Sequence, residues 1–125
     1  MRRFLLTTAA VAGTLVSAAC GDSTGLSSNV AGSYELQTIN GRSLPVSAGS
    51  DVIESAEIEL DADGDFVEIV RYDFGSPDVF TGTWERNGDE IIFDYNDGNT
   101  FIAQRTSSSR FVLDVNGDEW AYRRF

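Results

Sequence analysis

The residues that could perform acid–base or nucleophilic chemistry are few in kind. The chain has 125 residues, with nine arginines and twenty aspartates and glutamates, but neither histidine nor lysine. The Ser-His-Asp, Ser-Lys and Schiff-base routes of catalysis all need one of these two missing residues. Most carboxylates fall at turns or on the polar side of alternating segments, which indicates a solvated face. We therefore predict no catalytic residue and no enzyme activity, unless two buried carboxylates face one cleft.

One acidic segment has the residue types of a calcium loop. It spans residues 61–65 (DADGD), with Glu68 beyond it. An EF-hand needs glycine at its sixth position and glutamate at its twelfth, whereas here glycine comes fourth and Tyr72 is twelfth. A hairpin turn centred on Asp63-Gly64 explains the same residues. Zinc would need a set of cysteines and histidines that the chain lacks, so we predict neither a metal nor a cofactor.

The remaining candidates are large apolar side chains that could surround a ligand. The interior of an eight-stranded barrel is just wide enough to be filled by side chains or to hold one small ligand. Core packing is the favoured interpretation for Trp84 and Trp120, and ligand contact is the alternative. Arg124 shares the parity of Trp120 and Tyr122 in the last predicted strand and could meet a carboxylate ligand from inside. The predicted ligand-binding residues are Tyr34, Leu36, Ile58, Trp84, Phe93, Tyr95, Leu113, Trp120, Tyr122 and Arg124.

These side chains need strands to place them on a common face, and period-two alternation recurs from Tyr34 to the end of the chain. Residues 56–60 (AEIEL) put apolar side chains on one face and glutamates on the other, as in a half-buried strand. The facing of residues 66–74 stays open, because apolar residues occupy both parities there. The predicted strands are 33–39, 52–60, 65–73, 80–86, 90–95, 99–105, 110–115 and 119–124.

Asx-Gly pairs lie between most of these segments, and such pairs favour type I′ hairpin turns. The tetrapeptide Asn-Gly-Asp-Glu occurs at both 87–90 and 116–119, which indicates the same hairpin used twice. Eight short strands joined in succession predict an all-β protein, a small antiparallel up-and-down barrel that leaves no exposed edge. A two-sheet β-sandwich is the alternative.

The first twenty residues have the character of an export signal. Two arginines precede an uncharged, mostly apolar stretch at 4–16, which is too short to span a bilayer. Small residues at 17–19 then precede Cys20, and this pattern looks like a bacterial lipobox, in which the cysteine is acylated and the signal is removed before it. An ordinary signal cleaved after Ala19 is the alternative, but a single exported cysteine would then have no disulfide partner. We predict lipidation at Cys20.

The chain accordingly divides into a signal peptide at 1–19, a lipidated cysteine with a flexible Ser/Gly-rich tether at 20–29, and one domain at 30–125. Without the signal, seven arginines face twenty carboxylates, so the net charge is −13. Such an acidic surface excludes nucleic-acid binding, disfavours anionic headgroups and keeps a domain soluble and monomeric.

Both ends of the domain resemble lipocalins. Gly32-Ser33-Tyr34 opens the first strand and Arg123-Arg124 closes the last; in lipocalins, a G-x-W at the start of strand one packs beneath an arginine near the end of the barrel. The segments 32–45 (GSYELQTINGRSLP) and 121–124 (AYRR) resemble small bacterial lipocalin-like lipoproteins. Tyrosine stands where the family has tryptophan, and the domain is short, so both features argue against a roomy cavity. The resemblance implies a cation–π contact between Tyr34 and Arg124, with Arg123 as the alternative partner if the register shifts by one residue.

We therefore expect a non-enzymatic protein of the bacterial cell envelope, exported and held to the membrane by its N-terminal lipid, at the outer membrane or periplasmic face rather than in the cytoplasm. Its barrel would bind a small apolar or amphipathic ligand. The alternative is a structural or interaction lipoprotein whose filled barrel docks an envelope protein partner. An interior without a cavity of about 300 Å³ would favour this alternative.

Overall fold

The computed structural model describes residues 24–25 and 30–125, so the predictions for the signal peptide, for Cys20 and for most of the tether lie outside the described residues. Within the described part, no helix is long and apolar enough to cross a bilayer. The strands are β1 (Thr24–Gly25), β2 (Gly32–Ile39), β3 (Arg42–Ser43), β4 (Val46–Ala48), β5 (Asp51–Leu60), β6 (Asp65–Tyr72), β7 (Asp78–Asn87), β8 (Glu90–Tyr95), β9 (Thr100–Ser107), β10 (Arg110–Val115) and β11 (Asp118–Arg124).

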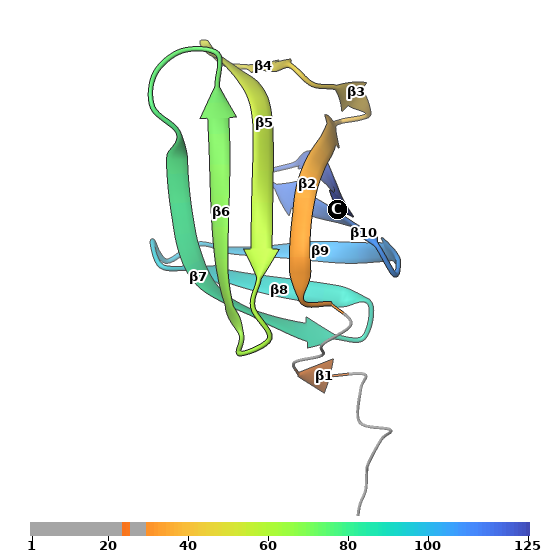
Figure 1. The fold of residues 1–125 in the computed structure, drawn as a ribbon. Helices are drawn as coiled ribbons and strands as arrows, with labels where there is room; N and C mark the ends of the chain where they lie inside the picture. The colour runs from red at the N-terminus through yellow and green to blue at the C-terminus, as the bar shows by residue number, and fades with distance from the viewer. Residues whose placement is uncertain (1–23, 26–29) are drawn as a thin grey trace, which may run out of the picture.

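The main strands close into an antiparallel barrel (Figure 1). Each strand from β5 to β11 pairs with the next along the chain, and β2 pairs with both β11 and β5. This ring confirms the predicted up-and-down barrel and rules out the two-sheet sandwich. The bounds of its eight strands lie within two residues of those predicted. The short strands β1, β3 and β4 were not predicted, and they add to the edges of β7, β2 and β5.

The barrel has two unlike ends. We call one end the base: β2 begins there, β11 ends there, and the turn between β5 and β6 lies there (Figure 1). We call the other end the mouth: it carries the 73–77 loop, the turns after β8 and β10, and the β3–β4 segment that crosses from β2 to β5. β1 pairs with the end of β7, at Asn87 and Arg86, so the described N-terminal residues lie at the base.

The repeated tetrapeptide forms two different turns, which corrects the prediction of one reused hairpin. In the second copy both residues of the 116–117 pair have positive φ, at 53° and 93°, as a type I′ turn requires. In the first copy Asn87 remains in β7 opposite Glu90, and only Gly88 has positive φ, at 65°, as in a type II′ turn. Asn87 is also paired with Thr24 of β1, whereas Asn116 lies outside the strands.

The facing of β6 is settled by burial. Phe66, Glu68 and Val70 are buried, with 1%, 4% and 3% of their surface exposed. Val67 and Ile69 point the other way and are half-buried. A glutamate therefore occupies the interior row of β6, and two aliphatic side chains occupy the outer row.

Aromatic rings fill the barrel from the base to its middle. The ring of Phe111 lies 4.8 Å from that of Tyr34, 5.2 Å from Tyr122 and 5.9 Å from Phe93, measured between centroids. Trp84 is buried at the base and donates its indole N–H to the carbonyl oxygen of Asp61 at 2.9 Å. Aromatic rings thus occupy this part of the interior.

The first and last strands are held together at the base by Tyr34 and Arg124, which are cross-strand partners. The guanidinium carbon of Arg124 lies 5.1 Å from the centroid of the Tyr34 ring. Arg124 Nη2 donates to the Tyr34 hydroxyl at 2.7 Å, and this hydroxyl donates to the carbonyl oxygen of Val30 at 2.6 Å. Arg123 is exposed on the outer face. The predicted contact with Arg124 is confirmed, and the alternative with Arg123 is wrong.

The closing pair can be tested with a double-mutant cycle that combines Tyr34→Phe and Arg124→Met. We expect a coupling free energy of about 1 kcal/mol or more in chemical denaturation, because the phenylalanine keeps the ring but removes the hydroxyl that accepts from the guanidinium. The matched cycle of Tyr34→Phe with Arg123→Met should give no coupling. Equal coupling in the two cycles would contradict this assignment.

Candidate functional site

A cavity of about 210 Å³ opens at the mouth of the barrel. Side chains from β6, β7, β8, β9, β10 and β11 contribute to it, because the inward rows of neighbouring strands converge where the aromatic filling ends. Most of its surface is aromatic or aliphatic. The residues that line it are Glu68, Val70, Tyr72, Phe80, Tyr95, Asp97, Asn99, Phe101, Val115 and Trp120.

Tyr95 organises the aromatic wall of this cavity. Its ring lies edge-on to three other rings, with centroid distances of 4.9 Å to Phe66, 5.2 Å to Phe101 and 6.0 Å to Phe80. Edge-to-face packing is the geometry that aromatic quadrupoles favour. The wall is therefore built from rings that fix one another, which gives the cavity a defined shape.

The floor of the cavity carries the buried carboxylate of Glu68. Its Oε1 accepts from the Tyr95 hydroxyl at 2.8 Å, and its Oε2 accepts from the Tyr122 hydroxyl at 2.9 Å. These two bonds join β6 to β8 and to β11 through the interior. An ionised carboxylate has about four lone-pair sites, so two remain after the tyrosines are satisfied.

Burial raises the pKa of Glu68, and the hydrogen bonds from the two tyrosines oppose this rise without cancelling it. The pKa values of Tyr95 and Tyr122 are raised as well. Burial first, and then the charge of Glu68, raise the pKa of Tyr95 and of Tyr122 above the usual range. Both phenols therefore stay protonated and serve the carboxylate as donors.

The electrostatic field in the cavity is negative. The pKa of Tyr72 rises to about 12 through burial, a hydrogen bond to Asp78 at 2.9 Å, and the charges of Asp78, Asp51 and Glu68. Asp97 adds to the rise in the pKa of Tyr95. None of the residues that line the cavity is an arginine.

The structure separates the predicted ligand-binding residues into three groups. Tyr95 and Trp120 line the cavity, and Tyr122 reaches it through Glu68. Arg124 lies at the base and is not among the lining residues. The others, Tyr34, Leu36, Ile58, Trp84, Phe93 and Leu113, are buried in the core.

Sequence reasoning missed most of the cavity wall and its floor. Glu68 was read only as an outlying member of an acidic loop, although it shares the parity of Phe66 and Val70. That parity was the available signal, and it was masked by Val67 and Ile69 on the opposite row. Phe80 and Phe101 are not among the predicted ligand-binding residues, although both line the cavity.

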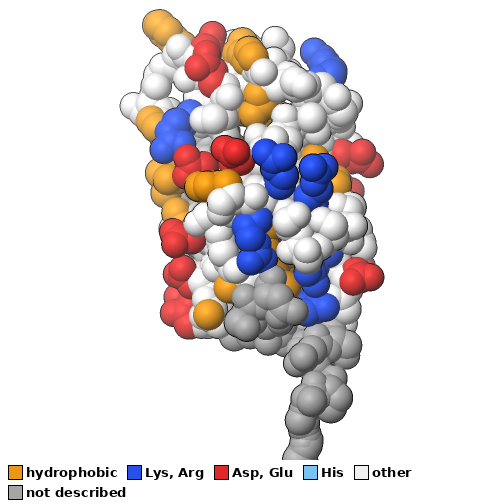
Figure 2. All heavy atoms as spheres, turned by 45° about the vertical axis from the view of Figure 1, so that its right-hand side comes forward, with side chains coloured by type: hydrophobic (Ala, Val, Ile, Leu, Met, Phe, Trp, Pro, Cys, Tyr) orange, Lys and Arg blue, Asp and Glu red, His pale blue; other side chains and the backbone are white. Residues whose placement is uncertain are grey.

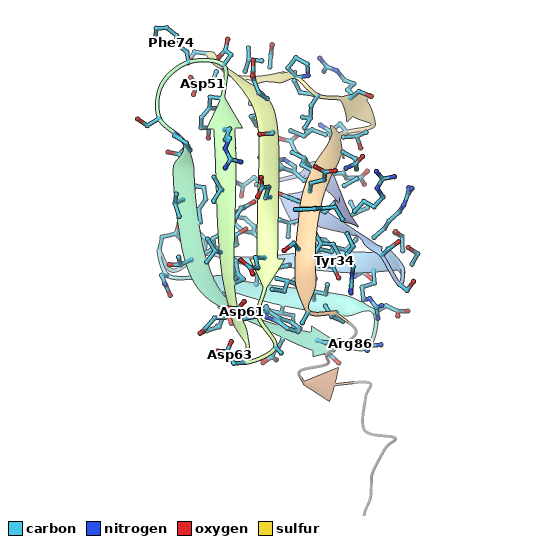
Figure 3. The ribbon with its side chains drawn as sticks, in the orientation of Figure 1. Tyr34, Asp51, Asp61, Asp63, Phe74 and Arg86 are labelled. Carbon is cyan, nitrogen blue, oxygen red and sulfur yellow. The ribbon has the colours of Figure 1, made fainter. Side chains whose placement is uncertain are left out.

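The acidic segment 61–65 forms the predicted turn at the base, where Figure 3 shows Asp61 and Asp63. The amide of Gly64, at a φ of 100°, donates to the carbonyl oxygen of Asp61 at 3.1 Å, and Asp63 Oδ1 accepts from the amide of Asp65 at 3.2 Å. Within residues 24–25 and 30–125, no group of three or more histidine, cysteine, aspartate or glutamate side chains is placed to hold a metal ion.

The size of the cavity limits what it can hold. At about 210 Å³ it is smaller than the ~300 Å³ at which drug-sized ligand pockets begin. A cavity below about 300 Å³ favours the alternative of a filled barrel that docks a protein partner. The cavity is nevertheless larger than the ~150 Å³ that suffices to bind benzene in an engineered protein core. A single ring or a short branched group would fit.

The raised pKa of Glu68 predicts a specific dependence of stability on pH. The folded state keeps the proton above the ordinary pKa of 4.5, where the unfolded chain releases it. The free energy of unfolding should therefore fall as pH rises from there through the folded-state pKa, by up to about 1.4 kcal/mol per pH unit. Glu68→Gln should lack this component, so its stability relative to the wild type should increase with pH.

The measurement is chemical denaturation of the wild type and of Glu68→Gln from about pH 4 to pH 8, an interval that extends above the pKa of an ordinary carboxyl group. Glu59→Gln is the matched control, because Glu59 is exposed on the outer face of β5. Its stability difference from the wild type should change little over the same range. A constant difference between the wild type and Glu68→Gln would contradict the prediction.

Comparison with known proteins bears on the fold. No family model matches the chain, and no curated protein matches it. Two solved structures are similar. A lipocalin-like protein from Bacteroides uniformis has a TM-score of 0.53 and 20% sequence identity, and the match covers 78% of this chain and 99% of that chain. An uncharacterized protein from Bacteroides eggerthii has a TM-score of 0.50 and 16% sequence identity, and the match covers 76% of this chain and 98% of that chain. At these identities the similarity establishes the architecture, which is a closed lipocalin-like barrel of eight antiparallel strands.

Proposed function

We propose that this protein is a lipid-anchored protein of the bacterial cell envelope, not an enzyme, whose lipocalin-like barrel binds a small amphipathic ligand at its mouth. The observation that carries the proposal is the aromatic cavity with a buried carboxylate at its floor. The lipocalin-like fold supports it, because small barrels can hold one ligand in the interior.

The chemistry of the cavity floor favours recognition over simple filling. Burying a carboxylate is costly even when it is hydrogen-bonded. A phenylalanine or leucine in place of Glu68 would join the apolar core without that cost, and the two tyrosine hydroxyls would then not be needed there. Polar groups that converge at the end of an apolar cavity, with shifted pKa values, are typical of binding sites.

The position of the cavity agrees with an anchor at Cys20. The chain enters the barrel at the base, where β1 pairs with β7, and the cavity opens at the opposite end. A tether of residues 20–29 spans at most about 35 Å when extended. On this proposal, the mouth faces away from the membrane and toward ligands dissolved in the surrounding compartment.

The arginines support the same orientation. Arg110 and Arg123 are cross-strand partners on β10 and β11, and Arg105 lies toward the same end of β9. Figure 2 shows a group of arginine side chains, with aspartates and glutamates beside them, on one side of a protein that is acidic overall. Lysines and arginines near a membrane surface are attracted by anionic lipids, by about 1 kcal/mol each. On this proposal, these arginines would offset locally the repulsion between an acidic protein and anionic headgroups.

Ligand binding can be tested with 2-phenylethanol, a neutral single-ring probe. We expect its addition to shift the NMR signal of the Trp120 indole N–H, because Trp120 lines the cavity. The signal of Trp84, bonded to Asp61 at the base, serves as an internal control and should stay in place. Val115→Phe should abolish the shift by filling the cavity, whereas Val112→Phe on the outer row of the same strand should retain it.

The anchor can be tested by growing a bacterial host that expresses the full chain with a radiolabelled fatty acid, beside Cys20→Ser. We expect label and membrane association in the first protein and neither in the second. Equal labelling of the two proteins, or a wild type found in the soluble fraction, would refute lipidation.

A second function, docking of an envelope protein partner, is favoured by the small cavity and by exposed apolar residues at the mouth. Phe74 stands on the 73–77 loop with 89% of its surface exposed (Figure 3), and Val79 follows with 61%. On this reading Phe74→Ser would weaken capture of the partner by the purified protein, whereas Val115→Phe would leave it unchanged. The opposite result would support the ligand pocket.

A further inference from the structure

The buried carboxylate of Glu68 is the strongest specific feature of the mouth cavity, and within residues 24–25 and 30–125 no cationic side chain is paired with it. Glu68 receives hydrogen bonds from two neutral phenols and from no arginine. Among the described residues, the one salt bridge joins Arg71 to Glu57 on the outer surface, at 3.0 Å. A buried carboxylate is normally paired with a cation or coordinated to a metal.

The walls around this carboxylate have the chemistry that receives an organic cation. Tyr72, Phe80, Tyr95, Phe101 and Trp120 all border the same small space. The face of an aromatic ring carries negative charge and attracts ammonium groups, and cages of such rings recognise quaternary ammonium ligands. Aliphatic and aromatic atoms also accommodate the carbon chain or ring that carries the charge.

The same walls exclude anions. The lining contributes two acidic side chains, Glu68 at the floor and Asp97, and no basic one. Asp78 and Asp51 act on Tyr72, another lining residue. An anionic ligand such as a fatty acid would enter this field against the charges of these groups and would find no arginine to pair with. A neutral ligand would leave the carboxylate without a counter-charge.

We infer that the mouth cavity binds a small organic cation, an ammonium group carried on a short apolar chain or a single ring, with the carboxylate of Glu68 as its counter-charge. This inference rests on the ligand-binding function proposed above and names the class of ligand. The ammonium lies against the floor among the aromatic faces, and the apolar part points toward the mouth.

Binding of a cation is coupled to ionisation of Glu68. Because the pKa of this carboxyl group is raised, a larger fraction of it is neutral at a given pH than for an ordinary glutamate, and a cation binds preferentially to the ionised form. The groups that face Glu68 or act on its surroundings are Tyr95 from β8, Tyr122 from β11, Tyr72 from its own strand, and Asp51, Asp78 and Asp97. The affinity for a cation should fall as the pH is lowered, and binding should release a proton.

The test compares three probes of nearly equal size: 2-phenylethylammonium, 2-phenylethanol and 3-phenylpropionate. The full chain is produced in a bacterial host, purified in non-ionic detergent and titrated with each probe while the Trp120 indole signal is followed. We expect the ammonium to bind at least about tenfold more tightly than the alcohol, and the propionate to bind more weakly than the alcohol. Calorimetry of the ammonium in two buffers of different ionisation enthalpy should detect proton release at mildly acidic pH.

The Glu68→Gln variant tests whether the preference for the cation depends on this carboxylate. It should bind the ammonium and the alcohol equally well, and the proton release should disappear. Glu59→Gln changes the net charge by the same amount on the outer surface and should keep the full preference for the cation. If Glu68→Gln does not fold, the order of the three probes and the proton release of the wild type still decide the matter.

The possible results distinguish the cation specificity from the ligand-binding function itself. An alcohol or propionate that binds as tightly as the ammonium overturns the assignment of a cation and leaves the ligand pocket in place. A preference for the cation that survives in Glu68→Gln also overturns it, because Glu68 is then not the counter-charge. Failure of all three probes to bind overturns the proposed ligand-binding function and the inference with it.

Discussion

The narrow interior of an eight-stranded ring is the constraint on which the rest of the structure depends. Side chains from opposite walls meet across it, so every large inward residue takes space from another. Gly82 shows how close this limit is: a Cβ there would collide with the carbonyl oxygen of Asp94 and lie 2.8 Å from the ring of Phe66. The absence of a side chain at this point of β7 lets the Phe66 ring reach Phe93, at 5.1 Å between centroids.

The same constraint makes Glu68 a structural group and, on our proposal, also the group that binds the ligand. Its carboxylate accepts hydrogen bonds from tyrosines on two other strands, and it also borders the cavity. A ligand that engages the two free lone-pair sites would complete a polar cluster that the protein itself leaves incomplete. Stability and recognition are therefore coupled at this residue, and a change that improves one is expected to cost the other.

The sequence predicted the ring of strands well because alternation and turn chemistry are local. The pattern at 56–60 and the glycine, tyrosine and arginine of the closing contact were sufficient for strand facing and for closure. The site was harder, because both rows of β6 are largely apolar and Glu68 lies on the row that is buried. Ile39 faces inward only because the pairing of β2 with β11 shifts register between Ala121 and Tyr122. Such shifts arise from contacts between distant segments, which alternation along one strand does not encode.

The closing contact at the base also brings the two ends of the domain together. Phe125 donates its amide hydrogen to the carbonyl oxygen of Ser33 at 3.1 Å, beside the start of β2. A short glycine linker from Phe125 to Val30 would therefore join the ends without disturbing the ring, and the turn at 116–117 would be a natural place to open it. In such a circular permutant both termini would lie at the mouth, and a lipid carried there would turn the cavity toward the membrane. The fold would be the same in both forms, so on the proposed anchoring the direction in which the cavity faces would depend on which end of the barrel carries the lipid.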